Sequence, residues 1–126
     1  MGQWPLKYLL DSNVLIDHFN GRQEATRFLE ANADQSTLSV ISRAEIMSSF
    51  EGPSAVTASR LLDSFQTLDI HKGIADLAAK LRREHGWKLP DAFQAAIAKH
   101  HGLKLVTRNT KDFSPAKHAF VLIPYK

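Results

Sequence analysis

The stretch Lys7-Tyr8-Leu9-Leu10-Asp11-Ser12-Asn13 decides the fold. Its short apolar run, residues 8–10, is typical of a buried strand in a parallel sheet. The run stops at Asp11, and residues 14–19 then have the apolar spacing of a short helix. A carboxylate at the carboxyl end of a buried parallel strand stands where α/β sheets bind their ligands. The sequence therefore predicts a polar site that begins at Asp11.

The rest of the chain alternates between strand-like runs and helical patterns. Strands are expected at residues 36–41, 65–70, 103–107 and 120–123, and helices at residues 22–32, 42–50, 58–65, 74–85 and 90–101. This alternation indicates βαβ units and a central parallel sheet with helices on both faces. We expect a three-layer α/β/α architecture in which residues 1–126 form one domain.

The composition is ordinary for a globular protein, with 44% hydrophobic and 23% charged residues. The chain contains no Cys, which excludes disulfides and thiolate metal sites. Its apolar runs are too short to span a membrane, and Met1-Gly2-Gln3-Trp4-Pro5 lacks the charged and apolar regions of a signal peptide. These features predict a cytoplasmic protein without a membrane segment.

The net charge of +3 is unevenly distributed along the chain. Residues 1–71 contain five Lys/Arg and nine Asp/Glu, whereas residues 72–126 contain eleven Lys/Arg and four Asp/Glu. A basic half joined to an acidic half is compatible with a polyanion that passes an acidic, cation-loaded site. The alternative is a solvated basic surface that binds no ligand.

Acids or amides recur at the junctions between strands and helices. They are Asp11, Glu45, Asp91, Asn109 and Asp112. Because the carboxyl ends of parallel strands share one edge of a sheet, these side chains should cluster. Carboxylates 4 Å apart repel by about 4 kcal/mol per pair at an effective dielectric near 20. Shared protons, Lys/Arg partners or divalent cations must therefore neutralise them, and oxygen ligands favour Mg²⁺ or Mn²⁺.

Helix capping offers a separate explanation for each junction. Asp11 would serve as the N-cap of a helix, and Ser42-x-x-Glu45 forms a capping box in which Glu45 bonds to the Ser42 amide. Pro90-Asp91 suits the first turn of a helix, and Asn109 and Asp112 suit a turn. Capping does not, however, require acids at nearly every strand end.

Four stretches resemble the motifs of PIN-domain proteins, particularly the VapC-like toxin ribonucleases. They are residues 10–17 (LDSNVLID), 42–46 (SRAEI), 89–98 (LPDAFQAAIA) and 105–113 (LVTRNTKDF). The matches occur in family order and span nearly the whole chain. The resemblance implies a PIN-like fold.

The resemblance also implies a set of site residues. Asp11, Glu45 and Asp91 would be metal-binding carboxylates, and the fourth family position, Asp or Asn, falls on Asn109. Asp112 is the nearest acid that could compensate for the uncharged amide of Asn109. The number of ions, one or two, stays open.

Four further residues adjoin these motifs. Asn13 and Thr107 are placed to orient Asp11 and a bound water through hydrogen bonds, with local capping as the alternative. Arg43 and Arg108 are expected to contact RNA phosphates, with a solvated surface role as the alternative.

The expected function is a Mg²⁺- or Mn²⁺-dependent endoribonuclease of the VapC-like toxin type. The resemblance implies tRNA or another structured RNA as substrate, a homodimer, and inhibition by a VapB-like antitoxin. One rival is a phosphotransfer enzyme of the haloacid-dehalogenase or receiver type with Asp11 as nucleophile, although the second Asp of the haloacid-dehalogenase pattern is Asn13 here. The other rival is a PIN-like RNA-binding module with weak or no catalysis.

Overall fold

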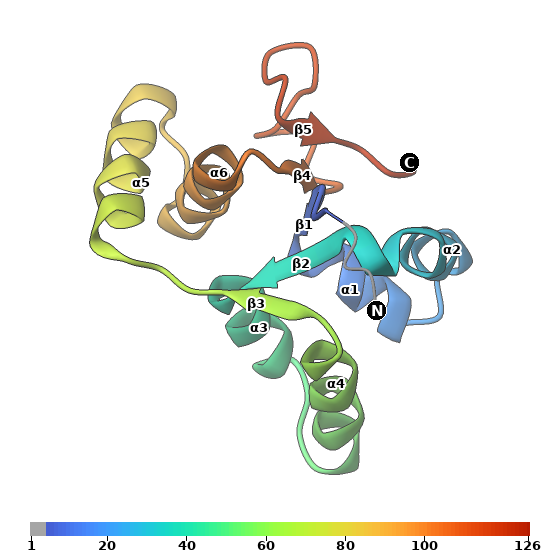
Figure 1. The fold of residues 1–126 in the computed structure, drawn as a ribbon. Helices are drawn as coiled ribbons and strands as arrows, with labels where there is room; N and C mark the ends of the chain where they lie inside the picture. The colour runs from blue at the N-terminus through green and yellow to red at the C-terminus, as the bar shows by residue number, and fades with distance from the viewer. Residues whose placement is uncertain (1–4) are drawn as a thin grey trace.

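Five parallel strands form one sheet, in the order β3-β2-β1-β4-β5, in the computed structural model, which describes residues 5–126 (Figure 1). The strands are β1 (Tyr8–Leu10), β2 (Ser36–Ser39), β3 (Gln66–Leu68), β4 (Lys104–Val106) and β5 (Val121–Leu122). The helices are α1 (Ser12–Phe19), α2 (Gln23–Asn32), α3 (Val40–Met47), α4 (Pro53–Asp63), α5 (Lys72–His85) and α6 (Leu89–His101), with the 3-10 helix η1 (Ala33–Gln35) between α2 and β2. The predicted α/β fold with a central parallel sheet is confirmed. Most of the stretch used for the signal-peptide argument, residues 1–4, lies outside the described residues.

Strand β1 is central because side chains on both of its faces are buried. Leu9 and Leu10 are both completely inaccessible to solvent. Leu9 packs into a core with α5 and α6, and Leu10 packs into a second core with α1 to α4. The two cores are the interfaces between three layers, with α5 and α6 on one face of the sheet and the other four helices on the opposite face (Figure 1).

Small side chains let α6 approach the sheet and α5 closely. Four alanines of this helix are fully buried: Ala92, Ala95, Ala96 and Ala98. The helix ends at Gly102, whose left-handed φ of 67° suits a residue without Cβ. Asp91, in the first turn of α6, lies close enough to Asp11 to be affected by its charge.

The start of α3 differs from the sequence expectation. Strand β2 ends at Ser39, and Val40 and Ile41, which were expected to continue the strand, form the first turn of α3. Ser39 is the N-cap, and its Oγ accepts a hydrogen bond from the amide of Ser42 at 3.1 Å. The predicted capping box with Ser42 as N-cap is therefore wrong, since Ser42 lies inside the helix. Glu45 is one turn further along α3.

The strand order places a reversal of direction beside β1. From β1 the chain builds β2 and β3 on one side, and it later returns to add β4 and β5 on the other. Ligands of open α/β sheets bind at the carboxyl ends of the strands at such a switch point. Here the switch point lies between Asp11, after β1, and Thr107, after β4. Within residues 5–126, no helix is both long and apolar enough to cross a membrane.

Candidate functional site

Asp11 is held at the carboxyl end of β1 by several hydrogen bonds. Its backbone amide donates to the carbonyl of Val106 in β4 at 2.9 Å, and the residue is only 6% exposed. Oδ1 accepts from the amide of Ser12 at 2.8 Å, as an N-cap of α1 would. Oδ2 accepts from the Thr107 hydroxyl at 2.8 Å and from Asn13 Nδ2 at 3.4 Å. Asp11 therefore caps α1 and is also bound from β4, which capping alone does not require.

Asn13 and Thr107 connect the two strand ends at the switch point. Asn13 Nδ2 donates to Thr107 Oγ1 at 3.1 Å, and Asn13 Oδ1 accepts from the amide of Arg108 at 3.2 Å. Thr107 is fully buried, so its hydroxyl proton has a defined acceptor in Asp11. Both side chains stand where they limit the rotation of the Asp11 carboxylate.

Glu45 and Asp91 face the same region from α3 and α6. Desolvation and the charge of Asp11 raise the pKa of Glu45, although a hydrogen bond with Ser12 opposes the shift. Desolvation, followed by the charges of Asp11, Asp112 and Glu45, raises the pKa of Asp91 to about 6, against a lowering effect of Lys88. A carboxylate in the first turn of a helix would ordinarily be stabilised by the helix dipole. Asp11, Glu45 and Asp112 thus lie within electrostatic reach of Asp91, and their charges oppose the effect of the dipole.

Asn109 and Asp112 lie in the turn after β4 and bond to each other. Asn109 Nδ2 donates to Asp112 Oδ2 at 3.0 Å, and Asn109 Oδ1 accepts from the amide of Asp112 at 3.2 Å. The buried ring of Trp87 donates its Nε1–H to the Asp112 carbonyl at 3.2 Å. Both ends of the Asn109 amide are thus engaged in the turn, while Asp112 contributes its charge to the environment of Asp91.

The two arginines beside the motifs are paired with aspartates. Arg43 Nη1 lies 2.9 Å from Asp63 Oδ1. Arg108 donates from Nε and, at 2.9 Å, from Nη2 to the carboxylate of Asp17, which also accepts from the hydroxyl of Tyr125 at 2.8 Å. Burial alone would raise the pKa of Asp17, but hydrogen bonds from Arg108 and Tyr125 hold it below its usual value. In this arrangement the guanidinium of Arg108 stabilises the carboxylate of Asp17.

The acidic group lacks ion pairs with basic side chains in the described part of the chain. Among residues 5–126, Asp11, Glu45, Asp91 and Asp112 form no ion pair with Lys, Arg or His. In that same part of the chain, no three Asp, Glu or His side chains already stand close enough to hold one ion. Glu45 is exposed and Asp91 is half-buried, so both carboxylates are accessible to an ion from solvent. In charge and donor chemistry, the group fits a hard divalent cation with oxygen ligands.

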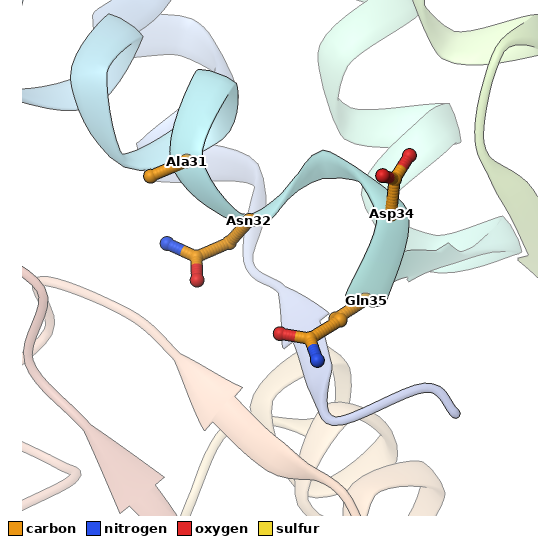
Figure 2. Close-up of a pocket in the computed structure, with 4 residues that line it drawn as sticks. All are labelled: Ala31, Asn32, Asp34 and Gln35. Carbon is orange, nitrogen blue, oxygen red and sulfur yellow. The ribbon is translucent and has the colours of Figure 1, made fainter. Parts of the chain in front are cut away.

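A pocket elsewhere on the molecule is separate from this acidic group. Ala31, Asn32, Asp34 and Gln35 line it, immediately before β2, at the amino ends of the strands (Figure 2). In Figure 2 the carboxylate of Asp34 points away from the amides of Asn32 and Gln35. These side chains do not converge, and the pocket lies at the opposite end of the sheet from Asp11.

One polar residue of the site was not predicted from the sequence. Gln94 on α6 is 1% exposed, and its Nε2 donates to Asp11 Oδ1 at 3.4 Å and to Ser42 Oγ at 2.6 Å. The available signal was a lone amide among the alanines of α6, three residues after Asp91. Periodicity places such a residue in the core but does not identify its hydrogen-bond partners.

Comparisons with known proteins agree with this fold. The family model described as PIN domain matches residues 8–118. The chain is 40% identical to a chain of a toxin–antitoxin complex from Klebsiella pneumoniae, with a TM-score of 0.86 over 95% of this chain and 99% of that chain. It is 26% identical to a chain of FitAcB from Neisseria gonorrhoeae, with a TM-score of 0.75 over 93% and 97% of the two chains.

A DNA-bound VapBC from Salmonella typhimurium shares the fold, with a TM-score of 0.74 at 20% identity over 86% of this chain and 90% of that one. A comparison with curated protein sequences gives no match. The family match covers β1, the sheet edge with its four acids, and most of the turn region after β4. The chain belongs to the PIN domain family.

Proposed function

We propose that this protein is a Mg²⁺- or Mn²⁺-dependent endoribonuclease of the VapC-like toxin type. The observation that carries the proposal is the group of four carboxylates at the switch point of the sheet, which lacks basic partners within residues 5–126. Four acids without ion-pair partners repel one another, and a divalent cation would reduce that repulsion.

Asp11, Glu45 and Asp91 would hold the cation, and Asp112 rather than Asn109 would supply the fourth charge. A bound ion of this kind would supply Lewis-acid stabilisation of the phosphodiester and would acidify the attacking water. Thr107 and Asn13 would keep the Asp11 carboxylate in one orientation, because both donate to its Oδ2. The ammonium group of Lys88, next to the start of α6, would contact a phosphate of the RNA backbone.

The charge of the chain supports a polyanionic substrate. Residues 72–126, which include α5, α6 and the turn with Asp112, contain seven more basic than acidic residues. Single-stranded loops of a structured RNA such as tRNA would reach the acids at the carboxyl ends of the strands most easily. Arg43 and Arg108 are paired with Asp63 and Asp17. Their main role would therefore be to stabilise the local structure, and contacts with RNA phosphates would be secondary.

The likeness to a toxin–antitoxin complex supports a partner protein. The structure with 40% identity comes from such a complex, and it matches nearly the whole chain. We infer that a small VapB-like antitoxin covers the four acids at the carboxyl ends of the strands. We also infer that the toxin is a homodimer of one-domain chains and that it works in the cytoplasm. Co-expression with the antitoxin, followed by size-exclusion chromatography with light scattering, tests both the complex and the dimer.

Cleavage of purified RNA tests the activity. The protein would be incubated with total tRNA and Mg²⁺ or Mn²⁺, with EDTA, and as the variants Asp11→Asn and Asp91→Asn. Discrete fragments that disappear with EDTA and in both variants are the expected result. Cleavage that continues in both variants would refute the site, and a trapped phosphate on Asp11 would favour a phosphotransfer enzyme. RNA binding with no cleavage under any metal condition would leave an RNA-binding module.

A further inference from the structure

A buried amide connects Asp11 to the two helices that carry the neighbouring acids. Gln94 is 1% exposed, and its polar atoms contact Asp11 and two buried serines. We propose that Gln94 is a positioning residue for the divalent cation, because it sets the spacing of Glu45 and Asp91 around Asp11. The inference rests on the proposed function, and it extends the site into the core beneath the acids.

Gln94 belongs to a continuous set of buried hydrogen bonds. The Ser39 hydroxyl donates to Gln94 Oε1 at 2.7 Å, while Gln94 Nε2 donates to Ser42 Oγ at 2.6 Å and to Asp11 Oδ1 at 3.4 Å. The Ser42 hydroxyl donates onward to the carbonyl of Leu10 at 3.0 Å. Among the described residues, no buried side-chain nitrogen or oxygen is left without a partner. The group is therefore fully satisfied, which makes it rigid.

The charge of Asp11 fixes the orientation of the amide. A rotation by 180° would place Gln94 Oε1 against Asp11 Oδ1, so that two acceptors would face each other in the core. A buried acceptor pair without a proton costs free energy, whereas the present orientation gives each atom a complementary partner. Gln94 is thus held in one orientation by the carboxylate that it supports.

The positions of these residues along their helices connect them to the other acids. Ser42 and Glu45 are three residues apart on α3, and Gln94 and Asp91 are three residues apart on α6. Residues at this spacing lie on the same helix face, one turn apart. The Gln94–Ser42 hydrogen bond therefore joins α3 to α6 one turn away from Glu45 and Asp91. It fixes how closely the two helices, and hence the two carboxylates, approach each other.

Replacing the amide by an apolar side chain of similar size would release this link. Gln94→Met keeps the length of the side chain but offers no strong donor or acceptor to Ser39, Ser42 or Asp11. Changes of this kind behind a metal ligand weaken metal affinity about 10- to 100-fold. We expect a rise of about tenfold or more in the dissociation constant for Mn²⁺, with the acids themselves unchanged.

Calorimetric titration of the intact protein with Mn²⁺ alone tests the inference. The wild type is compared with Gln94→Met and with Thr37→Val, a matched buried change on β2 whose hydroxyl donates to the Gln66 carbonyl. Asp11→Asn serves as the reference for a lost ligand. Thermal unfolding without metal, measured on the same samples, separates a loss of fold from a loss of affinity.

Weaker Mn²⁺ binding by Gln94→Met, with Thr37→Val equal to wild type, supports the inference. Equal affinity of wild type and Gln94→Met, while Asp11→Asn fails to bind, overturns the role of Gln94 and leaves the proposed function standing. No binding by the wild type, or undiminished binding by Asp11→Asn, overturns both. If Gln94→Met does not melt cooperatively, Ser42→Ala removes the same link from α3, and unchanged affinity in that variant overturns the inference.

Discussion

Asn109 and Asp112 form a closed pair, in which the side-chain amide of Asn109 donates to Asp112 Oδ2 at 3.0 Å and its oxygen accepts from the Asp112 amide at 3.2 Å. Asn109, which we predict to occupy the fourth family position, therefore orients the acid three residues later. In this arrangement Asp112 supplies the negative charge, and Asn109 orients the Asp112 carboxylate.

Separate substitutions of the two residues distinguish these roles. We expect Asp112→Asn to weaken Mn²⁺ activation of cleavage about tenfold, because it removes a charge near Asp91. Asn109→Ala should mainly remove the side-chain cap of the turn, at a cost of about 1 kcal/mol in the free energy of unfolding. Metal titrations of activity and urea unfolding measure the two effects. Loss of metal response in Asn109→Ala alone would assign the ligand to Asn109.

Asp91→Asn should stabilise the metal-free protein while it abolishes cleavage. The pKa of Asp91 in the folded protein, about 6, is above the ordinary value of 3.8, so the folded state binds more protons than the unfolded state between these values. The stabilising contribution of Asp91 protonation is therefore fully present below the ordinary pKa, and it is lost as the pH rises through the pKa of the folded state. Water screens this half-buried group, so the gain at neutral pH is on the order of 1 kcal/mol.

Urea unfolding in EDTA at about pH 4 and about pH 7.5, on either side of the raised pKa, tests the stabilisation by Asp91→Asn. The wild type and the variant should be closest at the acidic pH and should diverge at the neutral one. A variant that is less stable than wild type at neutral pH would mean that Asp91 has an unrecognised stabilising partner.

Divalent cations should raise the melting temperature of the wild type. A ligand present at about 100 times its dissociation constant stabilises the folded state by about 2.7 kcal/mol, which corresponds to a shift on the order of 5–10 °C for a chain of this size. The shift should be absent in Asp11→Asn. Thermal scans with Mg²⁺, Mn²⁺ and EDTA measure it, and equal shifts in both proteins would place the cation elsewhere.

The Asp17 pair should matter more for stability than the Arg43–Asp63 pair. Asp17 is 14% exposed in its side chain and accepts from Arg108 and Tyr125, so Asp17→Asn should cost about 2 kcal/mol. Asp63→Asn, at a side chain that is 66% exposed, is the control and should cost under about 0.5 kcal/mol. Equal costs in urea unfolding would contradict the ranking.

The lowered pKa of Asp17 also predicts a pH dependence. Burial opposes the shift, and the hydrogen bonds from Arg108 and Tyr125 outweigh it. Because its pKa in the folded state is below the ordinary value, its contribution is present above about pH 4 and is lost as the pH falls further. The difference between wild type and Asp17→Asn should therefore narrow as acid unfolding experiments pass below that pH. A difference that stays constant down to about pH 2 would show that the charge of Asp17 is not responsible.

The strands and the acidic edge were predictable from the sequence for the same physical reason. Apolar runs such as residues 8–10 end sharply, and the parallel topology brings the polar residues after each run to one edge of the sheet. Helix starts were less predictable, because Val40 and Ile41 suit a strand but form the first turn of α3, which is capped by Ser39. The contacts of Gln94 depend on the packing of α6 against α3, and local sequence carries no signal for that packing.

The central position of β1 also governs when the site assembles. Strand β1 pairs with β4, and the hydrogen bond from Thr107 to Asp11 spans 96 residues of chain. Such distant pairing is slow to form, and it cannot form before β4 has been synthesised. A nascent chain that does not yet include β4 therefore lacks the β1–β4 pairing that holds Asp11 in place. The order of synthesis therefore keeps Asp11 and Asp112 apart until β4 and the turn after it have been made.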